Sequence, residues 1–277
     1  MNNRLTVLMY HALLGSDGQC VGADPRYAVT RKVFRQQLAE IKRQDAKPQS
    51  LASILASSLT ASDSSRDVVF TFDDGHASNA DAAADLAEAG GSGDFFVNSS
   101  TVCQPNNLDW ATLREMAGAG ASIQSHGHTH RYFNELSESE IRYELLTSKH
   151  EIEARIGLPV TIFAPPGGRL QPAVARIARE VGYVAICSSN VGLWGRNSAT
   201  WNIPRFAVLR ETGDGQFRQW VSQDRLALMH LMARQTALDA AKKIFGNRGY
   251  EKLRARLLGG DKGGGGGHDD SKKSASP

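Results

Sequence analysis

The sequence predicts an α/β fold in which a parallel sheet closes, or nearly closes, into a (β/α) barrel of about seven strands. Short runs rich in Val, Ile and Phe alternate with helical patterns, at about one strand and one helix per 30 residues. That alternation is typical of parallel sheets with crossover helices. Seven such strands with helices between them favour a barrel over an open sheet, and a helical extension follows at the C-terminus.

The seven predicted strands are residues 5–10, 68–72, 95–97, 122–124, 160–164, 183–187 and 203–209.

Local signals mark the predicted helices between these strands. Thr30 and Asp109 are suited to cap helices, and Ser137 with Glu140 forms a capping box that opens a long helix ending near residue 156. Glycines close several of them, because glycine adopts the left-handed conformation that ends a helix. The predicted helices begin after Thr30 and Ser137 and span residues 77–89, 110–119 and 172–181.

Composition divides the chain into three predicted parts. Residues 1–210 form the barrel, residues 211–258 form a basic helical extension, and the Gly-rich residues 259–277 form a disordered tail that cannot bury a core. Apolar residues at helical spacing in the extension predict that it docks on the barrel. A partner or a membrane surface stays an alternative for those helices, although membrane contact is not predicted.

The charge balance and the N-terminus exclude several functions. The 277 residues carry 32 basic and 29 acidic side chains, and much of the small excess lies at 242–256, which is too weak and local to indicate nucleic-acid binding. The first apolar run, residues 5–10, is too short for a signal peptide or a membrane span. The sequence as it stands therefore predicts a cytoplasmic protein, or an extracytoplasmic one if a leader was removed.

Two adjacent carboxylates, Asp73 and Asp74, follow the strand predicted at 68–72. Ligand sites of parallel α/β folds form at the carboxyl ends of strands, where the loops converge. Adjacent side chains on an extended backbone point apart, so one carboxylate can bind a metal while the other faces the substrate. A helix cap and turn before Gly75 is the structural alternative.

A histidine cluster follows the strand predicted at 122–124. His126 and His130 are four residues apart, and a helical or tightly turned backbone would place both imidazoles on one side. Together with one carboxylate they make two nitrogens and one oxygen, a ligand set of catalytic zinc that leaves positions open for water. His128 between them is expected to point away or lie at the rim, and His76 is expected to be a helix-start residue.

Taken together, these motifs resemble those of the polysaccharide deacetylase family, whose shared module is the NodB homology domain, also called carbohydrate esterase family 4. The resemblance covers roughly residues 5–210. It rests on TFDDG (71–75) and HGHTH (126–130), with weaker agreement at LMYH (8–11), LDWATLRE (108–115) and FAPPGG (163–168).

The resemblance implies a distorted barrel and a hydrolase that depends on a divalent metal, commonly zinc. In that family the first Asp is the general base, which implies that role for Asp73. The second Asp and two histidines hold the metal, which implies Asp74, His126 and His130 as ligands. The implied partner is an acetylated glycan, and the implied reaction is removal of N-acetyl groups from amino sugars of a polysaccharide or a lipid-linked oligosaccharide. An O-acetyl esterase acting on a polysaccharide such as xylan is the alternative enzyme.

The sequence departs from the family pattern at two positions. Ala164 stands where an arginine usually orients the catalytic Asp, and Arg205 is a candidate substitute from another strand, with a solvated strand edge as its alternative. The usual late histidine is missing, since His230 falls in a predicted helix. His11 at the end of the first strand is a candidate acid, and whether His11, water or Asp73 protonates the leaving amine stays open. These departures motivate a third reading, a carbohydrate-binding relative without activity.

Overall fold

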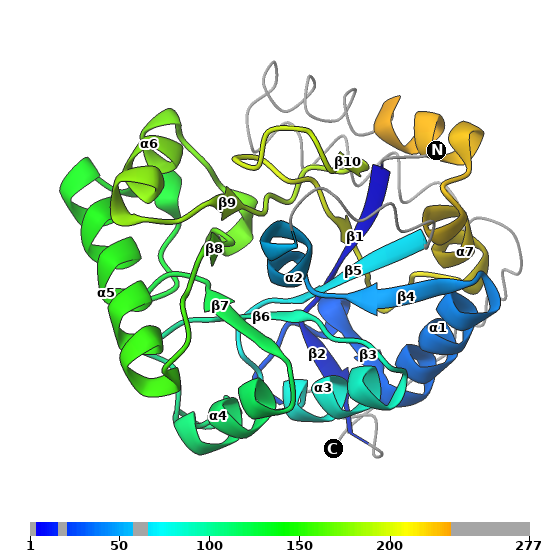
Figure 1. The fold of residues 1–277 in the computed structure, drawn as a ribbon, viewed down its shortest axis with the longest axis horizontal. Coiled ribbons are helices and arrows are strands. Elements are labelled where there is room, and N and C mark those ends of the chain that lie inside the picture. The colour runs from blue at the N-terminus through cyan, green and yellow to red at the C-terminus, as the bar shows by residue number, and fades with distance from the viewer. Residues whose placement is uncertain (1–3, 16–20, 58–65, 234–277) are drawn as a thin grey trace, which may run out of the picture. The chain divides into compact units, whose positions relative to one another are not determined.

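The computed structural model describes residues 4–15, 21–57 and 66–233 (Figure 1). The chain divides into two compact units, residues 1–229 and 230–277, and the sheet and its helices belong to the first. Figure 1 shows a curled sheet at the centre of this unit with α1, α3, α4, α5 and α6 around its outside. The predicted segment from 234 onward, including the Gly-rich tail, lies outside the described residues.

The elements have the following bounds. The strands are β1 Arg4–Tyr10, β2 Ala12–Leu14, β3 Ala28–Thr30, β4 Ala46–Gln49, β5 Arg66–Phe72, β6 Asp94–Val97, β7 Ser122–Ser125, β8 Ile162–Phe163, β9 Ala185–Ile186, β10 Trp194–Gly195 and β11 Phe206–Ala207. The α-helices are α1 Arg31–Arg43, α2 Leu51–Ala56, α3 Asn79–Glu88, α4 Trp110–Gly118, α5 Glu138–Ile156, α6 Pro172–Val181 and α7 Asp214–Ser222, and short 3-10 turns lie at Pro25–Tyr27, Phe133–Glu135 and Pro166–Gly168.

The main sheet is parallel except at one edge segment. Its order is β1-β5-β6-β7-β8-β9, with β11 also parallel to β1, and β10 pairs with the start of β1 in the antiparallel sense. β1 pairs with β5 along its length, from Thr6 opposite Val68 to Tyr10 opposite Phe72. β4 pairs with the first half of β5 and β6 with its end.

The segment that precedes β11 closes the sheet into a ring. Cys187, directly after β9, forms a parallel bridge with Ile203, whose N–H donates to the Ile186 carbonyl at 2.8 Å. β11, which follows Ile203 in the chain, then pairs with β1, so the chain after β9 joins the two ends of the sheet. The prediction of a (β/α) barrel of parallel strands is confirmed, and each of the seven predicted runs contributes to it.

Several strands are shorter than predicted, and β8 shows why. The run 160–164 contributes only Ile162–Phe163. The N–H groups of Thr161 and Ile162 donate to the side-chain oxygen Oε1 of Gln124 at 2.9 and 2.8 Å. A side chain thus replaces the strand partner at this point, and β9 and β11 are likewise two residues long. The sequence patterns did not reveal β2, β3, β4, β10 or α2, which are short and fall outside the regular repeat.

The sheet is buried on both faces, so β1 reads as a continuous apolar run. Alternation along β5 still separates the two faces. Val69 belongs to the barrel interior with Val7, Phe96 and Ile162. Phe70 and Phe72 point the other way and pack against Phe34 of α1, with ring centroids 6.1 and 5.8 Å apart. Asp73 follows two residues after Thr71, which lies on the interior face. The alternation therefore directs the Asp73 carboxylate inward.

The first helix of the predicted C-terminal extension packs on the barrel. Thr6 of β1 donates its hydroxyl to the carbonyl of Trp220 in α7 at 2.7 Å. The Trp220 ring stacks on Phe206 of β11 with centroids 5.2 Å apart. The predicted boundary at residue 210 stays a prediction. Across the described ranges, no helix combines the length and the apolar character needed to cross a membrane.

Candidate functional site

The candidate site lies at the carboxyl ends of neighbouring strands. Asp73 and Asp74 follow β5, and His126 follows β7. The N–H of Asp73 donates to the Tyr10 carbonyl, and the N–H of His126 donates to the Val97 carbonyl, both at 2.9 Å. The two motifs therefore continue the strand ladders on the same edge of the barrel, where loops meet in parallel folds.

Asp74, His126 and His130 converge on one point. The Nε2 atoms of both histidines lie 3.2 Å from Oδ1 of Asp74. The ligand atoms that the three side chains offer all lie within 4.8 Å of one another. The structure thus brings together the three residues that the sequence singled out as metal ligands.

The backbone that presents these ligands is neither extended nor helical. Asp74 has φ 75° and His130 has φ 60°, both in the left-handed region that non-glycine residues seldom adopt. Gly75 and Gly127 beside them are also left-handed, with φ 67° and 87°. The expectation of an extended backbone at Asp74 was therefore wrong, because a tight turn swings its carboxylate toward β7. Strain of this kind is concentrated at functional sites.

The chemistry of the three side chains fits a divalent cation. Burial raises the pKa of Asp74, but hydrogen bonds from His126 and His130 outweigh it and hold that pKa well below 3.8. The carboxylate is therefore ionised. His126 is only 2% exposed, and its buried Nδ1 has no hydrogen-bond partner in the described part of the chain. Asp74 and His130 are partly exposed, so the point where the ligand atoms meet is open to solvent.

Asp73 is held by Arg205 in the barrel interior. Nη1 of Arg205 donates to Oδ1 at 2.7 Å, and Nη2 donates to Oδ2 at 2.8 Å, so the pair is bidentate. Arg205 also donates to the Thr71 hydroxyl and the Ser188 carbonyl. Both side chains of the pair are buried, at 0% and 4% exposure. Burial raises the pKa of Asp73, but the charge and hydrogen bonds of Arg205, together with the nearby His126 and His11, lower it below 3.8.

Arg205 therefore lies inside the barrel and not at a solvated strand edge. It reaches the Asp73 carboxylate from the position directly before β11. Ala164, where the family usually places an arginine, is buried and donates its N–H to the Ser125 carbonyl at 3.0 Å. The structure brings Arg205 together with Asp73 from a part of the chain 132 residues away.

His11 lies near the same charges, at the end of β1. Burial lowers its pKa below 6.5, while the charges of Asp73 and Asp74 raise it and that of Arg205 lowers it. Its Nδ1 is buried and has no hydrogen-bond partner among residues 4–15, 21–57 and 66–233. Its ring lies 4.3 Å from the ring of Tyr27, centroid to centroid. The lowered pKa favours the neutral imidazole of His11 at the edge of the cluster.

His128, His76 and His230 lie outside the cluster of Asp74, His126 and His130. Nδ1 of His128 is 2.8 Å from the Ser99 hydroxyl, and its ring meets Tyr143 edge-on. His76 precedes α3, and its ring contacts the Ser78 hydroxyl and the Val21 carbonyl. His230 is exposed on a helical stretch. These placements agree with the roles that the sequence suggested for His128 and His76.

Comparisons with known proteins agree with this geometry. Residues 60–186 match the model of the polysaccharide deacetylase family. The protein YxkH of Bacillus subtilis (strain 168), whose name assigns it to the polysaccharide deacetylases, is 27% identical over 209 residues, which cover 74% of this chain and 71% of YxkH. Residues 60–186 therefore form a segment that matches the polysaccharide deacetylase family.

Two further relatives fit this assignment. A peptidoglycan-N-acetylglucosamine deacetylase of Bacillus cereus is 27% identical over 92 residues, which cover 33% of this chain and less than half, 41%, of that protein. The solved structure of the Streptococcus pyogenes deacetylase PplD in complex with acetate matches with a TM-score of 0.68 and 21% identity, over 79% of this chain and 98% of that one. At this identity the structural likeness establishes the fold, which is the barrel described above.

Sequence reasoning missed one buried carboxylate beside the deacetylase motifs. Glu144 of α5 is 2% exposed and accepts hydrogen bonds from the loop between His126 and His130. A signal for it does exist in the sequence, because Glu144 falls on the helix face that buries Ile141, Leu145 and Ile152. A charged residue on such a face needs partners.

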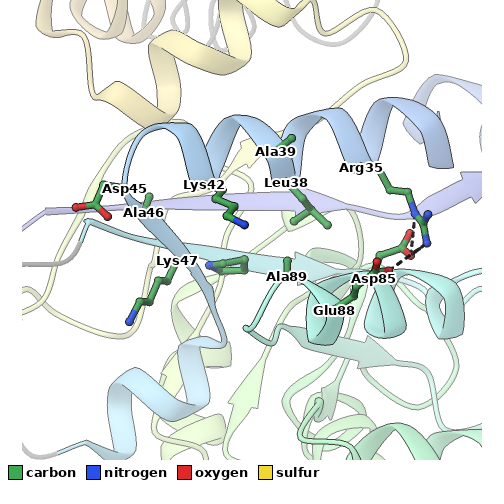
Figure 2. Close-up of a pocket in the computed structure, with 11 residues that line it drawn as sticks. Arg35, Leu38, Ala39, Lys42, Asp45, Ala46, Lys47, Asp85, Glu88 and Ala89 are labelled. Atoms are coloured by element: carbon green, nitrogen blue, oxygen red, sulfur yellow. Dashed lines mark hydrogen bonds and ion pairs between the residues drawn. The ribbon is translucent and has the colours of Figure 1, made fainter.

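A separate cavity of about 460 Å³ lies between α1, β4 and α3 (Figure 2). Figure 2 shows Arg35 bridging to Asp85 at one end of it, with a shortest distance of 2.6 Å. None of its lining residues belongs to the deacetylase motifs. Its lining has three cationic and three anionic side chains, so its charge favours neither sign of ligand: Arg35, Lys42, Lys47, Asp45, Asp85 and Glu88.

Proposed function

We propose that this chain is a metal-dependent polysaccharide deacetylase that hydrolyses N-acetyl groups on amino sugars of a polysaccharide or a lipid-linked oligosaccharide. One observation carries the proposal: two adjacent carboxylates have separate partners. Asp73 is paired with Arg205 in the interior, and Asp74 faces two histidines at the open end of the barrel. The similarity to a peptidoglycan-N-acetylglucosamine deacetylase supports the N-acetyl assignment.

Oδ1 of Asp74 and the Nε2 atoms of His126 and His130 would hold the divalent cation, which we propose is zinc. Two imidazoles and one carboxylate are a known ligand set of catalytic zinc. When bound, such an ion polarises a carbonyl and lowers the pKa of water, which is the chemistry that amide hydrolysis needs.

Asp73 is the general base in this proposal. Its pKa lies below the ordinary value, so the carboxylate is ionised at neutral pH and can accept a proton. It takes the proton from the attacking water and returns it to the nitrogen that leaves as the sugar amine, which balances the reaction of amide and water to amine and acetate. Arg205 keeps both carboxylate oxygens in a fixed orientation throughout.

In this proposal His11 assists departure of the amine as a neutral imidazole and not as an imidazolium acid. Burial lowers its pKa below 6.5, so its ring is neutral at pH 7 and carries one N–H. We propose that this N–H donates a hydrogen bond toward the leaving group. Replacing His11 by Phe is expected to slow acetate release less than replacing Asp73 by Asn, because Asp73 performs both proton transfers.

The N-acetyl assignment is tested by measuring acetate release from an N-acetylated chitooligosaccharide and from an O-acetylated xylan side by side. We expect release from the N-acetylated substrate. Release from the xylan alone would reassign the chain to the O-acetyl esterases. Bound zinc with no acetate from either substrate would favour a carbohydrate-binding relative without activity. The absence of an arginine at Ala164 is no longer an argument for that alternative, because Arg205 pairs with Asp73 instead.

A further inference from the structure

The loop between the two histidines, residues 127–129, needs hydrogen-bond acceptors that the sheet does not supply. β7 ends at Ser125, and the N–H of His126 still donates to a neighbouring strand. Beyond it the backbone turns through Gly127 in the left-handed region, so the next N–H groups have no strand beside them. Backbone N–H groups without a partner are costly when buried, so a fixed loop requires another acceptor.

Glu144 of α5 is that acceptor. Its Oε2 accepts the N–H groups of His128 and Thr129, both at 2.8 Å. Its Oε1 accepts the Thr129 hydroxyl. One carboxylate thus accepts the N–H groups of His128 and Thr129, which lie between His126 and His130 in the chain.

The packing around Gly127 brings α5 close enough for this contact. A Cβ atom at Gly127 would lie 3.4 Å from Oε2 of Glu144 and 3.3 Å from the Phe133 ring. One helical turn further along α5, the Ser148 hydroxyl lies 2.8 Å from the Ser125 hydroxyl, at the end of β7. The same face of α5 therefore supports the strand end and the loop that follows it.

The Glu144 carboxylate has no cationic ion-pair partner among the described residues. In the described part of the chain its three partners are neutral donors, and no Lys, Arg or His forms an ion pair with it. The carboxylate thus leaves a net negative charge, shielded from solvent, directly behind the loop that carries the histidines. A buried charge of this kind attracts a cation more strongly than an exposed one, because little water screens it.

We propose that Glu144 is a positioning residue of the metal site, a role that rests on the proposed function. It acts through the loop backbone and through its charge, and it does not touch the metal ligands' coordinating atoms. Partners that orient metal ligands in this way typically contribute about 10- to 100-fold to metal affinity.

The test is the affinity of the metal-free full chain for Zn²⁺, measured by competition with a chromophoric chelator. Glu144→Gln keeps the size of the side chain but removes its charge and replaces one acceptor oxygen by an NH₂ group. We expect its dissociation constant to rise about 10- to 100-fold. Glu144→Asp, which keeps the charge, is expected to lose less, and saturating Zn²⁺ should restore part of the turnover of both variants.

Glu153→Gln is the matched control. Glu153 lies further along α5 and also accepts a backbone N–H, that of Val160 at 2.9 Å, while Lys149 donates to it at 2.7 Å. The same chemical change there can reduce thermal stability, but it is expected to leave zinc affinity at the wild-type value. A general loss of helix stability would instead affect the two variants alike.

Thr129→Val keeps the test decisive if Glu144→Gln does not fold. It removes only the hydroxyl that Glu144 accepts, so we expect a smaller loss of zinc affinity, and that loss should disappear in the Glu144→Asp background if the two residues are coupled. Wild-type affinity in a folded Glu144→Gln variant, or in Thr129→Val when Glu144→Gln cannot be made, overturns the inference alone. A wild-type chain that binds no zinc overturns the inference together with the proposed metal dependence.

Discussion

Asp73 and Asp74 are neighbours in the chain, yet their surroundings differ in kind. Alternation along β5 directs Asp73 inward, where a buried arginine satisfies both of its oxygens. The left-handed backbone at Asp74 turns the second carboxylate toward the imidazoles of His126 and His130. The first carboxylate is paired with an arginine, whereas the second is the one that we propose binds the metal ion.

Replacing Arg205 by Met should destabilise the fold. Asp73 would then be a buried charge without a partner, a change that typically costs about 3–5 kcal/mol. The free energy of unfolding from urea denaturation measures the effect, and acetate release should fall with it because the base loses its orientation.

Arg176→Met provides the comparison for the Arg205 variant. Arg176 pairs with Glu138 and Glu180, and all three side chains are at least 40% exposed, so its loss should cost less than about 1 kcal/mol. Equal losses of stability in the two variants would contradict the assignment of Arg205 to a buried, bidentate pair.

At the scale of single elements, helix caps were the features most accurately predicted from sequence. The Thr30 side chain accepts the Val33 N–H, Asp109 accepts the Thr112 N–H, and the capping box of Ser137 with Glu140 is formed. Each of these interactions spans three residues, so the local sequence contains all of its partners. The strand-end carboxylates and histidines were predictable for the same reason, since each follows directly on an apolar run.

Features that depend on distant partners could not be predicted in this way. Whether Arg205 pairs with Asp73 depends on how the barrel closes, and β8 is short because Gln124 of another strand takes part of its hydrogen bonding. β4 and α2 are short elements that carry no apolar period of their own. The role of Glu144 depends on how α5 packs against β7.

The junction of β6 and α2 predicts a pH dependence of stability. Asp94, at the start of β6, is fully buried and accepts the N–H groups of Leu51 and Ala52 at the start of α2. Burial raises its pKa from 3.8 to about 6. The folded state therefore binds this proton more tightly than the unfolded state does.

The contribution of Asp94 to the unfolding free energy should consequently fall as the pH rises from about 4 to about 6, by up to about 3 kcal/mol at about 1.4 kcal/mol per unit. Denaturation across this range should show the slope in the wild type and in Asp109→Asn, an exposed cap variant. The slope should be reduced in Asp94→Asn, which does not titrate. An unchanged slope in Asp94→Asn would contradict the assignment.

At the scale of the whole molecule, closure of the sheet into a ring brings Arg205 to Asp73, the proposed base. Asp73 comes from β5, whereas Arg205 enters the interior after the chain has passed β9 and bridged Cys187 to Ile203. The proposed metal ligands come from β5 and β7 and do not depend on that closure. We therefore expect that the orientation of the proposed base and the proposed binding of the metal can be changed separately.

Ile203→Ala tests this separation. Ile203 is fully buried, so its truncation should cost about 2–5 kcal/mol of stability and loosen the segment that carries Arg205. We expect lower turnover at a temperature where the variant is folded, with zinc affinity unchanged.

The matched variant for ring closure is Ile177→Ala in α6, which truncates a comparably buried isoleucine away from the closure. It should lose similar stability but keep its turnover. Equal turnover in the two variants would mean that closure at Ile203 does not orient the base.

Zinc content and acetate release, measured together on the wild-type chain and on Asp73→Asn, test the division of labour between the two carboxylates most directly. We predict that the wild-type chain binds zinc and releases acetate from an N-acetylated glycan, that a chelator abolishes release, and that added zinc restores it. Asp73→Asn should bind zinc as the wild type does while its turnover falls by about 10²- to 10⁴-fold. Full turnover in Asp73→Asn, or acetate release that survives complete removal of metal, would contradict the account.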